Sequence, residues 1–279
     1  MYDFHTPEPV QLRLEFGAGD ILIAATETER STVEVIARRD DEATREAVAE
    51  TRVEQRGDTI VIEGLRRSTF FRRGPQLELH ITVPEHSILQ AKIESADLTV
   101  TGAMSDVDVK TGSGDVRLDT VSGDASIQTG SGDVEIEHAG RSTRVQGGSS
   151  DVQIREADGS LTASTGSGDI EIGRVAGRVQ VNSGSGDVQI REPGPEVAVN
   201  TASGDQSIGR VSQGSVRANA ASGDIRVGVA SGSAAWLSIN SLSGSVSSEL
   251  DGAEEPQPGE ETVEIRVNTV SGDINLTRA

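Results

Sequence analysis

The sequence predicts an all-β protein, a single-stranded parallel β-solenoid (β-helix) with about 18 residues per coil. Three observations predict it: a long-period repeat, two pairs of alternating apolar positions in each repeat, and an aromatic content of only 2%. Each repeat has a Gly/Ser turn that ends in aspartate, and these residues are spaced by eighteen at Asp97, Asp115, Asp133, Asp151, Asp169, Asp187 and Asp205. A β-sandwich would not keep that spacing over seven units.

Each repeat contains two short predicted strands. Apolar residues recur one and three positions after the aspartate, as at Val116 and Leu118, and again ten and twelve positions after it, as at Ala125 and Ile127. This period of two is typical of strands. Coils of this size must share one aliphatic core, because none can bury its side chains alone. A further column is expected to fill the corner between the strands: Ala103, Val121, Ala139, Ala157 and Val175.

We expect one elongated domain over residues 1–279, with irregular N-terminal coils in 1–93, regular repeats in 94–227 and irregular C-terminal coils in 228–279. The N-terminal region should contain one short surface helix near 40–50, since helix formers follow a capping aspartate there. Its predicted strands lie at 10–16, 21–24 (joined to the first by Gly17–Asp20), 32–37, 52–55, 59–63 and 77–83, the last leading through Pro84 into the repeats.

The repeat loosens after Asp205. An acidic Pro/Gly segment, 251–261, is expected to form a mobile loop from one coil. Trp236, the only tryptophan, is expected to cover the end of the core. Residues 263–279 should finish inside a coil, whose unpaired edges could support end-to-end self-association unless Arg278 and local charge block it.

Charge and composition exclude several classes. The net charge of −20 would repel phosphate backbones, so we expect no nucleic-acid partner. Without cysteine there is no disulfide framework and no thiolate metal site. The N-terminus lacks the features of a signal peptide, and no apolar run is long enough to span a membrane. We therefore expect a cytoplasmic protein, and peripheral attachment to a membrane is the alternative left open.

Three features together resemble a known family: the Gly-Ser-Gly-Asp repeats with alternating Val/Ile, the N-terminal Gly-Ala-Gly-Asp-Ile pair, and Ile81-Thr82-Val83-Pro84 entering the repeats. They are similar to the bacterial putative-adhesin family of β-strand repeats, whose function is unknown. The resemblance covers nearly the whole chain. It implies a β-repeat fold, an adhesin-like surface role and, for some members, a link to cell-envelope stress, and it supplies no catalytic residues.

The aspartate ladder is the first candidate site. Stacked carboxylates about 5 Å apart repel by about 0.8 kcal/mol in water, so the row must stay solvated, have raised pKa values or bind cations. The corner resembles the calcium-binding nonapeptide roll, but lacks one residue of its motif. We favour turn capping by the carboxylates. The alternative is a metal role for Asp115, Asp124, Asp133, Asp151, Asp169 and Asp187.

A basic and aromatic segment, 66–73, is the second candidate. It could meet an anionic membrane surface or dock on a protein partner. The alternative is a loop folded over the solenoid with its phenylalanines buried. The residues concerned are Arg66, Arg67, Phe70, Phe71, Arg72 and Arg73.

Catalysis and cofactors find little support in the sequence. The histidines, His5, His80, His86 and His138, have no ligand spacing. We therefore expect a non-enzymatic β-repeat scaffold or interaction protein without cofactors. One alternative is a carbohydrate-binding or carbohydrate-active β-helix, for which the repeated aspartates could supply paired carboxylates. The other is a calcium-stabilised repeat protein.

Overall fold

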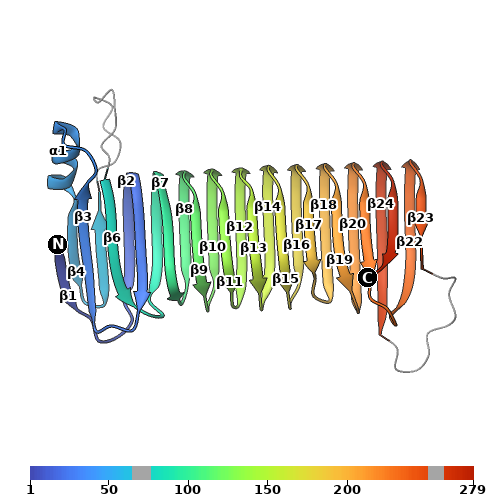
Figure 1. Cartoon of the computed structure of the whole chain (residues 1–279), viewed down its shortest axis with the longest axis horizontal. Coiled ribbons are helices and arrows are strands. Elements are labelled where there is room, and N and C mark those ends of the chain that lie inside the picture. The colour runs from blue at the N-terminus through green and yellow to red at the C-terminus, as the bar shows by residue number, and fades with distance from the viewer. Residues whose placement is uncertain (65–76, 251–260) are drawn as a thin grey trace. The chain divides into compact units, whose positions relative to one another are not determined.

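The computed structural model describes residues 1–64, 77–250 and 261–279. They fall into two compact units, unit 1 (residues 1–141) and unit 2 (142–279). Both consist of stacked coils of parallel strands, which confirms the predicted β-solenoid (Figure 1). The expectation of one elongated domain remains a prediction. The candidate segment 66–73 and most of the acidic segment, 251–260, lie outside the described residues.

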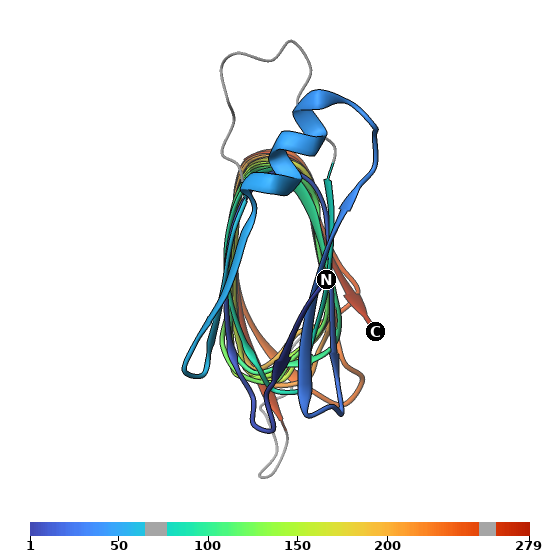
Figure 2. The same ribbon diagram turned by 90° about the vertical axis from the view of Figure 1, so that its left-hand side faces the viewer.

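Unit 1 contains eleven described strands and the helix α1. Its regular coils pair in parallel with a shift of one repeat, so that Val109 lies beside Ile127 and Val116 beside Val134. Figure 2 shows strands on two sides of a narrow interior. The strands are β1 (Tyr2–His5), β2 (Gln11–Thr26), β3 (Arg30–Ala37), β4 (Arg52–Arg56), β5 (Thr59–Glu63), β6 (Leu77–Pro84), β7 (Ile88–Met104), β8 (Val107–Ser113), β9 (Val116–Val121), β10 (Ala125–Ser131) and β11 (Val134–Ala139).

The N-terminal strands differ from the prediction in two respects. Strand β1 was not predicted, and residues 11–16 and 21–24 belong to a single strand, β2, which continues through the expected turn. Gly19 has φ +131°, a value that glycine adopts without strain, so the backbone can bend at the corner while the pairing with β7 continues. The turn residues therefore shape a corner without interrupting the ladder.

Antiparallel strands complete the N-terminal part of unit 1. β1 pairs with β3, β3 with β6, and β4 with β5, all antiparallel. The helix α1 spans Glu42–Glu50 and confirms the predicted surface helix. Asp41 is its cap, because Asp41 Oδ1 accepts the N–H of Thr44 at 2.8 Å. The helix packs against β3 and β6 and buries Ala47.

Unit 2 repeats the same coil. One side is the ladder β12–β14–β16–β18–β20, and β13–β15–β17–β19–β21 is the other. The strands are β12 (Ser142–Ser149), β13 (Val152–Ala157), β14 (Ser160–Ser167), β15 (Ile170–Val175), β16 (Val179–Ser185), β17 (Val188–Glu192), β18 (Glu196–Ser203), β19 (Gln206–Val211), β20 (Gly214–Ser222), β21 (Ile225–Val229), β22 (Ala234–Ser243), β23 (Val246–Ser248), β24 (Thr262–Ser271) and β25 (Ile274–Arg278).

The last coils of unit 2 are stacked out of chain order. β24 pairs with β20 on one edge and with β22 on the other. The coil of 262–278 is therefore stacked between the coil that contains β20 and the coil of 234–248 (Figure 1). The prediction that 263–279 forms the uncovered coil was therefore wrong. Val263, Ile265 and Val267 are fully buried. The alternating β-branched residues of β24 bury the most apolar surface when a coil lies on each side of them, whereas β22 carries serine and exposed apolar residues.

The predicted apolar columns form the core. The residues one, three, ten and twelve positions after the ladder aspartates are buried almost without exception in both units. Two predictions were wrong. Ala103 is half-buried, and Met104 lies beside Val121 because the register shifts between Val100 and Ala103. Trp236 does not cover the core, since it points outward from the edge strand and is 63% exposed.

Candidate functional site

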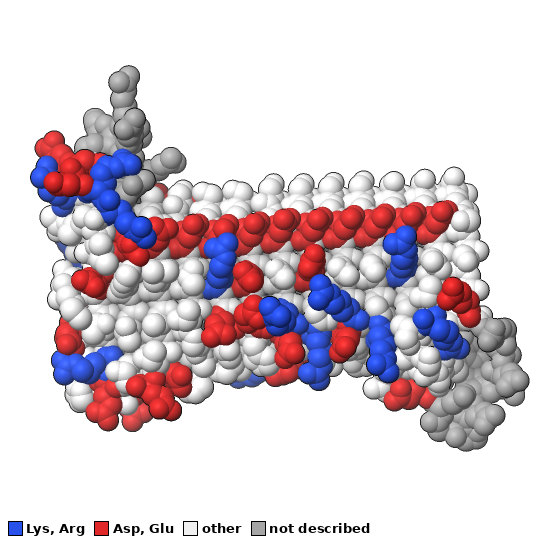
Figure 3. Space-filling view, in the orientation of Figure 1, with Lys and Arg blue, Asp and Glu red and all other residues white. Residues whose placement is uncertain are grey.

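The aspartate ladder is built from backbone hydrogen bonds at one corner of each coil. In unit 1, the N–H of Asp115 donates to Asp97 Oδ1 at 2.9 Å and the N–H of Asp133 to Asp115 Oδ1 at 3.0 Å. Asp124, at the other corner, donates likewise to Asp106. In unit 2 the same bond, 2.8 Å long, joins Asp151, Asp169, Asp187, Asp205, Asp224 and Asp273 in that order. The carboxylates form a continuous row within each unit (Figure 3).

At Asp115 and Asp273 the hydrogen bonds favour the charged form of the carboxylate. The Asp133 N–H and then the Arg117 guanidinium, 2.9 Å away, hold the pKa of Asp115 below its ordinary value. The Ser245 N–H does the same for the pKa of Asp273. In the residues that the structure describes, no group of three or more His, Asp or Glu is placed to hold a metal ion. The geometry thus supports turn capping, and the metal role of the six candidate aspartates stays a prediction.

A row of asparagine side chains runs across unit 2. In stacking order it comprises Asn182, Asn200, Asn219, Asn268 and Asn240. The last four amide nitrogens each donate to the side-chain oxygen of the neighbouring asparagine, at 2.9 to 3.0 Å, whereas Asn182 Nδ2 donates to Ser164 Oγ at 3.5 Å. Ser164 and Gln146 hold the equivalent positions on β14 and β12. The row is outward-facing and uncharged.

A shallow groove of about 640 Å³ follows this row. Gln146, Ser164, Asn182 and Asn200 line one part, and glycines line another. A Cβ added at Gly166 would lie 2.6 Å from the carbonyl oxygen of Gly148, so the close stacking requires glycine there. Among the described residues no charged side chain lines the groove, although the chain has a net charge of −20. We call this surface the amide groove.

Unit 1 has a charged counterpart of about 500 Å³ in the same columns. The two lysines of the chain, Lys92 and Lys110, are register partners that line it together with Glu94. Lys92 Nζ lies 3.4 Å from Glu15 Oε1. The charge pattern thus distinguishes the two grooves although their backbones are equivalent.

Sequence reasoning missed both grooves, although a signal was present. The position five residues before the ladder aspartate is always polar, as at Lys110, Gln128, Gln146, Ser164 and Asn182. The fold follows from the apolar columns alone, so this polar column does not stand out in the sequence.

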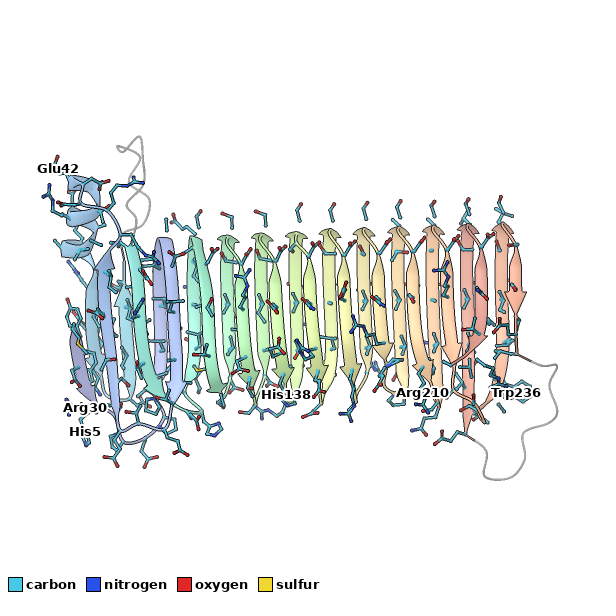
Figure 4. The ribbon with its side chains drawn as sticks, viewed as in Figure 1. His5, Arg30, Glu42, His138, Arg210 and Trp236 are labelled. Atoms are coloured by element: carbon cyan, nitrogen blue, oxygen red, sulfur yellow. The ribbon has the colours of Figure 1, made fainter. Side chains whose placement is uncertain are left out.

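His80 belongs to a charged cluster on β6. His80 Nε2 lies 2.5 Å from Glu78 Oε1, and Arg38 binds the other oxygen of that carboxylate. Glu78 is only 8% exposed, and the hydrogen bond from His80, followed by Arg38, lowers its pKa although burial raises it. His5 and His138 belong to separate strands, β1 and β11 (Figure 4). The cluster of Arg38, Glu78 and His80 thus links β6 to the residue that follows β3.

The predicted interaction residues Arg66, Arg67, Phe70, Phe71, Arg72 and Arg73 all lie outside the described residues. Their proposed contact with a membrane or a protein stays a prediction. Within the described part of the chain, α1 is the only helix, and it is too short to cross a bilayer.

Comparison with solved structures finds matches along nearly the whole chain. A putative adhesin from Parabacteroides distasonis is 12% identical, with 98% of this chain and 95% of that chain covered and a TM-score of 0.49. A putative adhesin from Bacteroides fragilis is 14% identical, with the same coverage and a TM-score of 0.37. A putative lipid binding protein from Parabacteroides distasonis is 12% identical, with 99% and 95% covered and a TM-score of 0.39.

No curated protein sequence matches the chain. A family model, by contrast, matches nearly all of it. The model describes the Toastrack DUF4097 family and matches residues 11–213 and 179–277, which include the repeats, the aspartate ladder and the asparagine row. The chain belongs to the toastrack family DUF4097.

Proposed function

We propose that this chain is a non-enzymatic interaction protein, a β-repeat scaffold of adhesin-like type that holds an extended, uncharged polar partner along the amide groove of unit 2. The observation that carries the proposal is the hydrogen-bonded row of asparagines beside a glycine-lined groove without charge. Polar residues that serve only to keep the surface soluble would not need to occupy the same column in successive coils.

The asparagine amides suit a ligand rich in hydroxyl or amide groups. Each amide has two N–H donors and two acceptor lone pairs, and the row uses one donor and one acceptor of Asn200 and of Asn219. The rest can serve a ligand. Because the coils stack at about 4.8 Å, the groups repeat along the groove and many weak contacts can add up.

A scaffold role also agrees with how the chain uses its carboxylates. Hydrolases of glycosidic bonds need two carboxyl groups that flank the bond, one able to give a proton. The ladder aspartates instead accept backbone N–H groups, and the pKa values of Asp115 and Asp273 are lowered. These features favour structural use over proton transfer.

Carbohydrate is the second candidate that a specific observation favours. Sugar hydroxyls are donors and acceptors, as amides are, and the lining of the amide groove is uncharged. Among the described residues that line the groove there is no aromatic side chain on which a sugar ring could stack, so we expect weak binding to a single sugar and stronger binding to a polymer.

Filling the groove tests the proposal. Ala202 and Ala221 line it and are exposed, so changing both to arginine leaves the core intact. The matched control changes Gln153 and Gln189 to arginine, because both are exposed and lie on the other side of the coil, on β13 and β17.

The three proteins are compared on an array of neutral polysaccharides and on uncharged extended peptides, followed by calorimetry of any ligand found. We expect binding by the wild type and the control, and at least a tenfold loss in the groove variant. Equal binding by all three proteins would contradict the amide groove as the site. Turnover of a bound polysaccharide would contradict the non-enzymatic role.

A further inference from the structure

The coil of residues 234–248 is the outermost coil of unit 2 on its side. β22 pairs with β24, and β23 pairs with β25. Along the other edge of β22, no strand of the described residues is paired. Such an edge presents a row of backbone N–H and C=O groups that can template pairing with another chain.

The core of unit 2 is open at this coil. Leu237 and Val246 hold the same inward columns as Ile265 and Ile274, which are buried. Leu237 is 42% exposed and Val246 is 52% exposed, because no further coil of the described residues covers them. On the outer surface Trp236 and Leu242 are exposed as well, 63% and 84% (Figure 4 labels Trp236). Exposed apolar patches of this kind mark interaction sites.

The coil also lacks the charged residues and prolines that usually protect an edge strand. Residues 234–248 contain no Asp, Glu, Lys, Arg, His or Pro, in a chain of which 25% is charged. In unit 1, by contrast, the antiparallel strands β1 and β4 carry ion pairs, Asp3 with Arg30 and Glu54 with Arg56. Charged residues on edge strands normally prevent pairing between molecules.

The ladder aspartate is missing at this coil. Ser245 donates its N–H to Asp273 Oδ1 at 2.7 Å, but it has no carboxylate to accept the N–H of a following coil. A head-to-tail continuation of the parallel stack would leave that N–H without its usual partner. A twofold contact between two such coils needs no acceptor at this corner.

We propose that this edge binds a second copy of the chain, with β22 of the two copies paired antiparallel about a twofold axis. The coil cross-sections are then identical, and side-chain alternation keeps both sets of inward residues inside a shared core. The absence of charge lets two molecules of net charge −20 meet without like charges in contact. The proposal does not depend on the amide groove.

The contact is small, so the dimer should be weak and reversible. Repulsion between the two acidic molecules acts outside the contact and is screened by salt, with a Debye length of about 8 Å at 0.15 M and about 3 Å at 1 M. Association should therefore strengthen as salt is added, the reverse of a contact held by ion pairs.

Sedimentation velocity over roughly 5 to 500 µM, a range suited to a weak interface, tests the proposal. The edge variant changes Ser238 and Leu242 to glutamate, both exposed and outward on β22. The matched control changes Ala198 and Ala202 to glutamate. Both alanines hold the same columns on β18, a strand that is paired on both edges. Circular dichroism checks that all three proteins fold.

We expect wild type and control to shift from monomer to dimer with concentration, and the edge variant to stay monomeric throughout. Amide hydrogen exchange in β22 of the wild type should slow as the dimer forms. A wild type that remains monomeric at the highest concentration would overturn the proposal, as would an edge variant that dimerises equally well. Growth beyond the dimer would overturn the twofold arrangement.

Discussion

Replacing Asp187 by alanine and by asparagine separates two opposing effects of the aspartate ladder. Asp187 Oδ1 accepts the N–H of Asp205 at 2.8 Å, and the N–H of Asp187 donates to Asp169 Oδ1 at the same distance. Alanine removes both the acceptor and the charge. Asparagine removes the charge but keeps an oxygen that can accept.

The expected changes follow from the geometry. The lost hydrogen bond lowers the free energy of unfolding by about 1 kcal/mol. Two neighbouring carboxylates about 5 Å away each repel Asp187 by about 0.8 kcal/mol before screening, which leaves about 0.9 kcal/mol in total at 0.15 M salt and about 0.3 kcal/mol at 1 M. The asparagine variant should therefore be more stable than wild type at 0.15 M salt, and by less at 1 M. The alanine variant should be about 1 kcal/mol less stable than the asparagine variant at both.

Urea unfolding at the two salt concentrations measures these differences from the transition midpoints. Asp108 is exposed and outside the ladder, so the same two changes there serve as a control. Equal midpoints for the alanine and asparagine variants at both salts would refute the structural role of the acceptor. A rise in the wild-type midpoint with calcium that is absent in the asparagine variant would make the ladder a cation site instead.

Three further predictions concern buried and strained positions. Gln206 is 1% exposed, and its Nε2 donates to Thr201 Oγ1 at 2.9 Å and to the carbonyl oxygen of Asn219 at 2.8 Å, while its Oε1 has no partner among the described residues. Valine there removes both hydrogen bonds and should lower the free energy of unfolding by about 1 kcal/mol, and a gain in urea unfolding would contradict this. Glu78 has a lowered pKa through His80 and Arg38, so the ionised pair stabilises the fold above the ordinary pKa of a glutamate, about 4.3. That contribution should disappear as the pH falls through the lowered pKa, and the Glu78→Gln variant should show a flatter acid denaturation curve; identical curves would contradict it. Gly186 has φ +129° and an added Cβ would lie 2.1 Å from a carbonyl oxygen, so alanine should cost more than about 2 kcal/mol, and an unchanged melting temperature would contradict this.

Most of the fold could be predicted because the same apolar pattern recurs in each regular coil. The alternation around Val116 and Leu118 recurs in every regular unit, and stacking at one repeat follows from burial alone. The helix could be predicted because Asp41 provides a local cap. Local signals of this kind do not depend on distant parts of the chain.

The order of the last coils could not be predicted in the same way. Whether 262–278 stacks on β20 or beyond β22 depends on which coil gains more from coverage on both edges, and the local pattern is strand-like in both. The exposure of Trp236 follows from that order, since its strand became the edge. The asparagine row was predictable in principle, because its column is visible in the repeat, but its hydrogen bonds depend on the in-register stack.

The most direct test of the proposed function follows the asparagine side-chain amides by NMR while a ligand found in the binding screen is titrated in. The account predicts that the side-chain resonances of Asn182, Asn200 and Asn219 shift together, in proportion to the amount bound, and that the groove variant with Ala202 and Ala221 changed to arginine shows no such shifts. Binding with unchanged asparagine resonances, and shifts confined to other surfaces, would contradict the claim that the amide groove is where this protein holds its partner.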